Sequence, residues 1–383
     1  MGGGVTFLHE ERRALERYLP GLDAELTALP LAALESPDSP AIELFREAGG
    51  PGLLVPRDHR GAGAGPLDAI RVQRAIGSRS PSLAVASTMH HFSVASLVQL
   101  DSDGDGGFEW MLLEAIADGR KLLASGFAEG VRGQDVFAPT MRGRRDRDRV
   151  LVSGRKKPCS LSRSMDLLTA SVLVEGNGSG PAEELAVAVI AADAPGLEVE
   201  PFWGSSVLAG AQSDAVVLND VPVEDELVFP LGTRGPDRLD AVQEAGFLWF
   251  ALLMTASYLG VASALVERAL LAPRGDASLR VGAAAELEAA AASLEGIAHR
   301  LAAGEAGSWL LTRALLCRYA AQDAIGRAVA SAVEQLGGVA FVSSDDVNHL
   351  AGASRALALH PPARPRTADA LADALGGAEL RIG

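Results

Sequence analysis

Histidines and one glutamate are the residues whose types could carry proton transfer in this sequence. His360 is followed by two prolines, and an imidazole, whose pKa lies near neutrality, can act as a general base there. The alternative is a histidine packed in a loop. Glu244 precedes a long apolar run and is the second candidate base, or else an exposed residue at the start of a helix.

Two adjacent histidines, His90 and His91, form a second candidate group. Neighbours on a helix point to different faces, so at most one of them can line a site. They lack partners at metal-ligand spacing, and Cys159 and Cys317 are far apart without a Cys-x-x-Cys pattern. We therefore expect no metal site, with His91 contacting a polar substrate or both histidines lying in the core or at the surface.

Composition narrows the class of protein. The 383 residues include 34 Lys and Arg against 49 Asp and Glu, a net charge of -15, which argues against a nucleic-acid binder. With 48% hydrophobic residues the chain can bury large cores. No basic segment followed by an apolar core opens the sequence, and the apolar run 246–265 contains polar residues and is flanked by glutamates. We expect a cytoplasmic protein with no membrane span.

The hydrophobic pattern divides the chain into three parts and predicts an α+β fold. Residues 1–122 have helical spacing and form an N-terminal helical domain, and residues 123–233 carry short runs bounded by turns, which are typical of a β domain. Residues 234–383 are again helical and form a bundle. Its four helices are predicted at Leu239–Leu271, Leu279–Ala303 and Ser308–Leu336, and from Thr367 onward.

Five segments in one order resemble motifs of the acyl-CoA dehydrogenase superfamily. They are Gly52–Pro56 with Gly61–Gly63, Ser125–Asp135, Ser153–Lys156 with Ser160, Asn219–Val223, and Gln335–Gly338. Each segment alone is weak, but five in collinear order cover nearly the whole chain. The resemblance implies the fold of that superfamily: an N-terminal helical domain, a middle β-barrel or sheet domain and a C-terminal four-helix bundle.

The resemblance also implies a flavin, FAD, with FMN as the alternative. Backbone groups of Phe127 and Ala128 would meet the ring, and the Ser160 hydroxyl would lie near its N5, unless Ser160 is an ordinary turn serine. Further cofactor contacts are implied by the matched segments at Gly133, Gln134 and Pro158.

The adenosine half of the cofactor would meet the bundle of a second subunit. Gln335, Gly337 and Gly338 are the residues implied, although Gly337 could equally end a helix. Arg274 would reach the pyrophosphate or is a surface arginine. A homodimer or homotetramer is therefore expected.

The usual catalytic glutamate of the superfamily is missing. An ungapped alignment of residues 347–361 places Pro361 at its position, with His360 just before it, and the alternative helix position falls at or near Phe250. Proline also lacks the N–H that would polarise a thioester. Another base such as His360, a shifted loop, or a different reaction could explain the difference.

Three functions remain open. The first is a flavin-dependent dehydrogenase (desaturase) of a short or branched acyl thioester on CoA or acyl carrier protein, with electrons passed to an electron-transferring flavoprotein or another acceptor. Trp249 and Phe250 would shorten its acyl cavity, or simply pack in the core. The second is a two-component monooxygenase of the same fold fed with reduced flavin, which needs no glutamate. The third is an inactive binding or scaffold protein.

Overall fold

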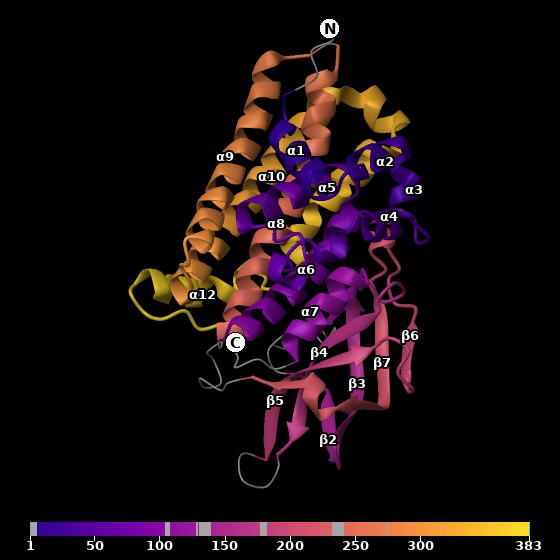
Figure 1. The fold of residues 1–383 in the computed structure, drawn as a ribbon. Coiled ribbons are helices and arrows are strands. Elements are labelled where there is room, and N and C mark those ends of the chain that lie inside the picture. The colour runs from indigo at the N-terminus through magenta and orange to yellow at the C-terminus, as the bar shows by residue number, and fades with distance from the viewer. Residues whose placement is uncertain are drawn as a thin grey trace.

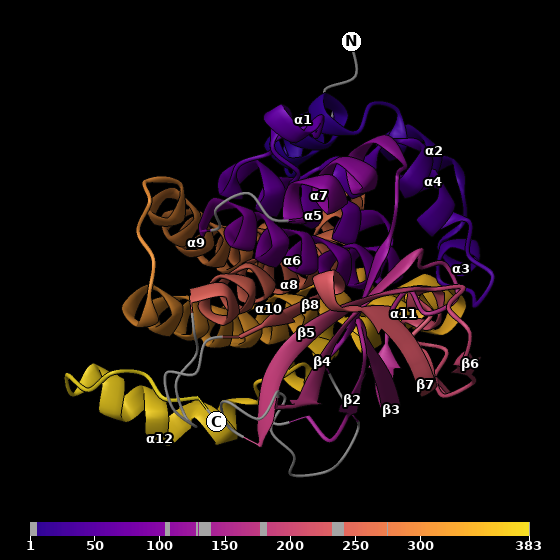
Figure 2. The same ribbon diagram turned by 60° about the horizontal axis from the view of Figure 1, so that its bottom comes forward.

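The protein consists of helices stacked on one end of a β-sheet (Figure 1). The computed structural model describes residues 6–103, 108–127, 129, 139–176, 182–231, 241–273 and 275–382. The two helical regions, far apart in sequence, pack together on the same side of the sheet (Figure 2). The α+β class predicted from the sequence is confirmed.

The N-terminal region is helical. Its α-helices are α1 (His9–Tyr18), α2 (Leu22–Ala28), α3 (Leu31–Leu34), α4 (Ala41–Glu47), α5 (Pro66–Arg79), α6 (Pro81–Asp103) and α7 (Glu109–Asp118). Proline begins both α5 and α6, where its missing N–H costs no helical hydrogen bond. Two short 3₁₀ turns, η1 (Gly50–Gly52) and η2 (Arg57–His59), link α4 to α5.

The middle region forms an eight-stranded sheet within the described residues. Its strands are β1 (Leu123–Gly126), β2 (Arg142–Asp146), β3 (Arg149–Cys159), β4 (Leu167–Glu175), β5 (Glu183–Ala191), β6 (Leu197–Glu200), β7 (Asp214–Glu224) and β8 (Val228–Pro230). Their order is β6-β7-β3-β2-β4-β5-β8, and β1 pairs with β4 in parallel. Strand β4 is buried continuously from Leu168 to Val172, so both of its faces are covered at the centre of the sheet.

The C-terminal region contains α8 (Ala241–Leu271), α9 (Ala277–Ala302), α10 (Ser308–Ser343), α11 (Asp345–Ala353), the 3₁₀ segment η5 (Ser354–Leu359) and α12 (Arg364–Leu375). Three of the four predicted bundle helices agree closely with α8, α9 and α10. The last helix begins at Arg364, earlier than predicted, because Pro365 fits its first turn. The short helix α11 was not predicted.

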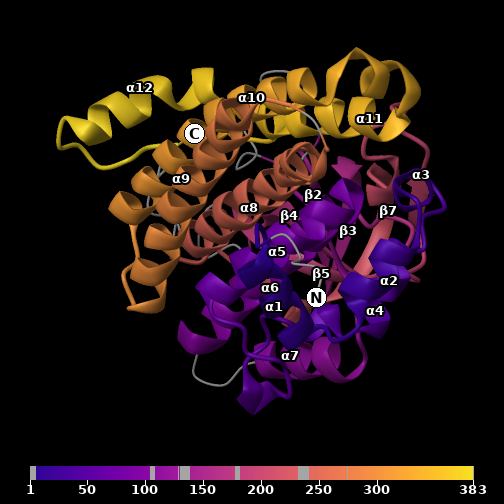
Figure 3. The same ribbon diagram turned by 90° about the horizontal axis from the view of Figure 1, so that it is seen from above.

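Helix α8 lies at the centre of the molecule, between α5 and α6 on one side and α9 and α10 on the other (Figure 3). Glycines let α5 and α8 cross in close contact, since a Cβ on Gly260 would lie 2.2 Å from the Arg74 carbonyl oxygen. Helices α8 and α10 are both long and apolar enough to cross a membrane. The apolar part of α8 is almost wholly buried, as the sequence predicted for a core helix.

Candidate functional site

A cavity of about 190 Å³ opens between α6, α8 and the sheet. On α6, the lining residues Val85, Met89, Phe92 and Ser96 recur at intervals of three or four and so share one face of the helix. Helix α8 contributes a matching face that begins with Val242. The cavity is therefore enclosed by one face of each of these two helices and by the sheet.

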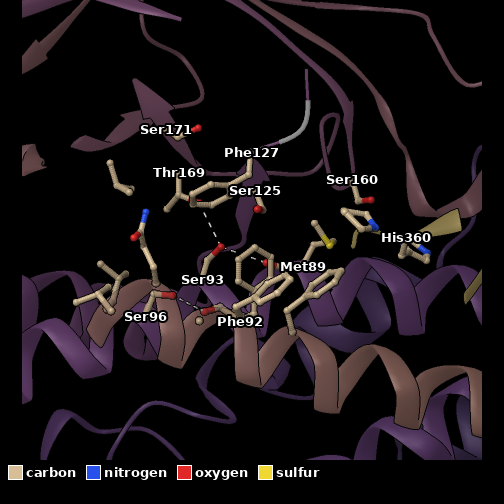
Figure 4. Close-up of a pocket in the computed structure, with 18 of the residues that line it drawn as sticks. Met89, Phe92, Ser93, Ser96, Ser125, Phe127, Ser160, Thr169, Ser171 and His360 are labelled. Carbon is tan, nitrogen blue, oxygen red and sulfur yellow. Dashed lines mark hydrogen bonds between the residues drawn. The ribbon is translucent and has the colours of Figure 1, made fainter. Parts of the chain in front are cut away.

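The sheet side of the cavity is lined by hydroxyl groups (Figure 4). Thr169 and Ser171 alternate along β4, so both face the helices, and Thr169 lies 3.2 Å from Ser93 on α6. The Ser160 hydroxyl lies 2.9 Å from that of Ser213. The Ser125 hydroxyl is buried and has no hydrogen-bond partner among the described residues. A buried hydroxyl normally has a partner, so this wall is suited to a ligand with polar atoms along one edge.

The opposite side of the cavity is aromatic. The ring of Phe92 lies 5.8 Å from that of Phe127 and 5.5 Å from that of Phe250, and Phe247 stacks on Phe250 at 6.2 Å. These four rings bind apolar groups by contact and leave little room for a long chain. The cavity therefore combines an aromatic lining with a row of hydroxyl groups.

His360 lines the same cavity and is held from behind by a buried tyrosine. Its Nε2 lies 2.8 Å from the hydroxyl of Tyr258 on α8. Burial, and then the charge of Arg318, lower the pKa of His360 to about 3, and burial raises the pKa of Tyr258. Both groups are therefore neutral near pH 7, which makes His360 a poor general base and a good hydrogen-bond donor.

A buried ion pair supports the hydroxyl wall. Lys156 on β3 donates to Glu129 at 2.8 Å and to the Ser171 hydroxyl at 3.1 Å. Burial alone would raise the pKa of Glu129, but hydrogen bonds from Lys156 and Thr140 outweigh it and lower that pKa to about 2. Two segments that the sequence singled out separately, around Glu129 and around Lys156, thus meet behind the cavity.

Several residues predicted from the sequence come together here. Phe127, Pro158, Ser160, Phe250 and His360 all line the cavity, although they come from the sheet, α8 and the loop before α12. These residues thus line one cavity, and their roles toward a flavin or a substrate stay predictions.

Other predicted residues lie elsewhere. His91 is fully buried beside Phe45 and is absent from the cavity lining, so its ring nitrogens are not placed to contact a substrate there. Its neighbour His90 links Pro51 to Leu123 through both ring nitrogens and so has a structural role. Helical periodicity alone could not say which of the pair faces inward.

The α8 candidates also fall outside the lining. Gln243, Gly246, Phe247 and Phe250 face the cavity, whereas Glu244 and Trp249 lie at intervening positions on other faces of the helix. Neither a carboxylate nor any other charged side chain lines the cavity within the described part of the chain.

The remaining predicted cofactor residues are not among the described residues that line the cavity. Ala128, Gly133, Gln134 and Arg274 lie outside the described residues. Gln335 accepts a hydrogen bond from the Asp276 N–H at 3.0 Å, and Gly337, with φ 81°, breaks α10 just before Gly338. Their contact with a cofactor across subunits stays a prediction.

Sequence reasoning missed Tyr258, Arg318, Ser125 and Ser213. Tyr258 follows Phe250 by eight residues, a spacing that returns to nearly the same face of a helix, so its position was a usable signal. Arg318 interrupts the buried stripe of α10 that contains Leu311, Leu315 and Ile325, and its position in that stripe was a usable signal. Ser125 opens one of the matched motifs but was not itself singled out, and Ser213 carried no signal of its own.

The chain is similar to several known proteins. No family model matches the chain. It is 42% identical over 377 residues to isobutylamine N-hydroxylase of Streptomyces viridifaciens, covering 98% of this chain and 99% of that protein. Among solved structures it resembles a nitrososynthase from Micromonospora carbonacea var. africana, with a TM-score of 0.81 and 21% identity over 98% and 99% of the two chains. It also resembles FMN-bound TdsC from Paenibacillus sp. A11-2, with a TM-score of 0.80 and 18% identity over 99% of both chains.

Proposed function

The chain belongs to the flavoproteins of the acyl-CoA dehydrogenase superfamily, and from that membership we propose that it is the oxygenase component of a two-component monooxygenase that N-hydroxylates a small primary amine. A separate reductase in the same cytoplasm supplies reduced flavin. This is the second of the three functions that the sequence left open. The full-length similarity to an amine N-hydroxylase supports it.

The observation that carries the proposal is the chemistry of the cavity wall. Oxidation of an acyl thioester requires a base that removes the α-proton, and the described lining offers only a neutral histidine whose pKa is about 3. Transfer of oxygen to an amine requires no such base, because the nitrogen lone pair is itself the nucleophile. The cavity thus suits oxygenation better than dehydrogenation.

The wall residues suit a flavin. The Ser125 hydroxyl, which has no partner in the described part of the chain, and the Ser160 and Ser213 pair would hold its polar edge, while Phe127 and Pro158 would pack against the rings. Reduced flavin bound there supplies two electrons and two protons, so that one atom of dioxygen joins the amine nitrogen as a hydroxyl group and the other leaves as water.

We propose FMN rather than the FAD expected from the sequence. The amide oxygen of Gln335 already accepts a hydrogen bond from Asp276 in its own chain, which leaves it less available to an adenosine group. The similar structure of TdsC carries FMN, which agrees with this choice. Binding of FAD by the purified protein is therefore measured beside binding of FMN.

An uncharged cavity selects the reactive form of the substrate. Moving an ammonium ion from water into a wall of phenyl rings and hydroxyls costs several kcal/mol, whereas the neutral amine loses far less. The hydroxyls of Ser93 and Thr169 can hydrogen-bond the nitrogen, and the four phenylalanines contact a short or branched alkyl group. The substrate we propose is therefore a short, apolar primary amine.

Desaturation of a short acyl thioester is the second candidate. It follows from the superfamily resemblance and would use the same apolar cavity. Pro361 at the cavity wall has no N–H to polarise a thioester carbonyl, which counts against it. Its acyl carrier and its electron-transferring flavoprotein partner belong to this second candidate only.

The experiment that separates the two candidates uses purified protein, a flavin reductase and NADH. With isobutylamine or a similar amine in air, we expect a hydroxylamine product and amine-dependent NADH consumption. With isobutyryl-CoA in the absence of oxygen, we expect no bleaching of oxidised flavin. An unsaturated thioester in the second assay and no hydroxylamine in the first would replace the proposal by desaturation.

A further inference from the structure

Arg318 on α10 is a buried cation with no acidic partner among the residues described. Its side chain is 1% exposed, and its hydrogen bonds all go to backbone carbonyls. Burial is the main cause that lowers its pKa to about 10, so the guanidinium still carries its charge near pH 7. A buried charge without a counter-ion is costly, and proteins rarely keep one that has no task.

The guanidinium holds the segment that carries His360. Nη1 donates to the Pro361 carbonyl at 2.9 Å, and Nη2 donates to the carbonyls of His360 at 2.7 Å and of Leu357 at 3.2 Å. These carbonyls lie at and beyond the end of η5, where the backbone has no helical donors left for them. Arg318 thus holds the backbone before, at and after His360.

The charge also acts on the cavity. The guanidinium carbon lies 5.8 Å from the centre of the Phe250 ring, and both Phe250 and His360 line the cavity. After burial, the Arg318 charge is the second cause that lowers the pKa of His360. The cation is therefore separated from the reaction space by a single layer of side chains.

Few other ionisable groups face His360. Tyr258 on α8 contacts its Nε2, and Tyr319 on α10 is turned away toward the Pro362 carbonyl and Thr367. The carboxylate that acts on Tyr258 is Glu35, which is already engaged by Ser80, Ser82 and His349. Among these groups, Arg318 is the charged one that adds to the effect of burial in lowering the pKa of His360.

We propose that Arg318 is the positioning residue of the site, which holds the His360 loop against Tyr258 through its hydrogen bonds to the carbonyls of Leu357, His360 and Pro361. With Tyr258 donating to Nε2, the ring hydrogen is on Nδ1, on a side chain that lines the cavity. His360 then serves as an oriented hydrogen-bond donor toward the reacting groups. The proposal rests on His360 lining the active cavity and not on the substrate being an amine.

The test compares two substitutions of the same residue. Arg318→Lys keeps the positive charge and can still donate to the carbonyls, whereas Arg318→Met keeps only the apolar part. Arg313→Met is the matched control, because Arg313 is an exposed arginine on the same helix. Circular dichroism and thermal unfolding first establish which variants are folded.

If Arg318 had a purely structural role, its replacement would leave the pKa of His360 unchanged. The first measurement is therefore the titration of His360. In histidine-labelled protein its resonance is assigned by its loss in a His360→Asn variant and followed by NMR between pH 3 and 8. We expect a pKa well below 6 in the wild type, Arg313→Met and Arg318→Lys. In Arg318→Met we expect a measurable rise that stays below the ordinary value, because burial of the ring, the larger cause, remains. This measurement requires no substrate, so its outcome is independent of the amine proposal.

Kinetics supply the second readout. A misplaced reacting group lowers turnover on the order of 100-fold, so we expect that loss of kcat in Arg318→Met, with KM for the amine little changed and partial rescue by lysine. If Arg318→Met fails to fold, Arg318→Lys alone decides, since a His360 pKa raised to its ordinary value in that variant contradicts the proposal. An unchanged His360 titration and turnover in folded Arg318→Met would also overturn it.

Discussion

The Tyr258 hydroxyl lies 2.8 Å from Nε2 of His360, although 102 residues separate them in the chain. Tyr258 belongs to the central helix α8 and His360 to the loop before α12, so this bond joins two walls of the cavity. Because burial favours the neutral form of both groups, the pair acts as an oriented hydrogen-bonding unit and not as an acid and its base.

Removal of the Tyr258 hydroxyl should disconnect flavin oxidation from product formation. In Tyr258→Phe, His360 loses the bond that fixes its tautomer and ring orientation, so we expect NADH consumption to continue while hydroxylamine falls about tenfold and hydrogen peroxide rises. Product and peroxide are measured in the same reaction. Tyr18→Phe, which removes a hydroxyl bonded to Asp68 away from the cavity, is the control and should behave as wild type. Equal product yields in both variants would contradict this role.

The pH dependence should follow the amine and not the enzyme. His360, with its pKa lowered to about 3, is already neutral throughout the range from pH 6 to 9 and contributes no change there. The amine is mostly protonated in this range, so we expect kcat/KM to rise about tenfold per pH unit until the pH reaches the amine's own pKa. Two amines of different pKa distinguish the cases. An inflection near pH 6.5 shared by both amines would show that a histidine of the enzyme titrates instead.

The size of the alkyl group should be limited by Phe250. Its ring contacts Phe92 and stacks on Phe247, so Phe250→Ala enlarges the cavity and should raise the preference for longer amines over isobutylamine by at least about tenfold. The same change removes a ring that is 6% exposed and should cost about 3–5 kcal/mol of stability. Phe45→Ala, which opens the core away from the cavity lining, serves as the comparison. A specificity change of the same size in both variants would refute the assignment.

The ion pair behind the wall should act on stability. Lys156→Met removes the only positively charged partner that the described residues show for the buried Glu129 carboxylate, so we expect a loss of about 3–5 kcal/mol in the free energy of unfolding. Adding Glu129→Gln should recover much of it. Lys121→Met, which removes a half-exposed pair with Asp166, should change stability by less than about 1 kcal/mol.

The stability that the Lys156–Glu129 pair contributes should depend on pH. The pKa of Glu129 is lowered in the folded protein to about 2, below its ordinary value of 4.5, so its contribution is present above pH 4.5 and is lost as the pH falls toward 2. Urea unfolding at pH 3.5 and 7 measures the difference. Wild type should lose more stability between these conditions than Glu129→Gln, and equal losses would contradict the assignment.

Much of the fold could be predicted because it depends on local patterns. Helical spacing predicted α8 and α9 to within a few residues, since each buries apolar residues that recur at helical intervals. The helix α11 was missed because it is short and contains Gly352 in its last turn. Pro158 and Ser160 were placed at the site by the order of the motifs rather than by their own chemistry.

The chemistry of the site was harder to predict because it depends on helix rotation and on distant contacts. Nothing local distinguishes His90 from His91, or Glu244 from Gln243, until the helix is packed and one face is turned to the cavity. His360 was identified as a candidate base from its residue type. Its low pKa arises from Arg318 and from burial, which the sequence does not reveal.

The most direct test of an oxygenating function is the fate of dioxygen. Purified protein, flavin reductase, NADH and isobutylamine are incubated under ¹⁸O₂, and the amine products are analysed by mass spectrometry. We expect a hydroxylamine that carries one ¹⁸O atom derived from the gas. An amine recovered unchanged while isobutyryl-CoA is converted without oxygen to an unsaturated thioester would contradict the proposed function.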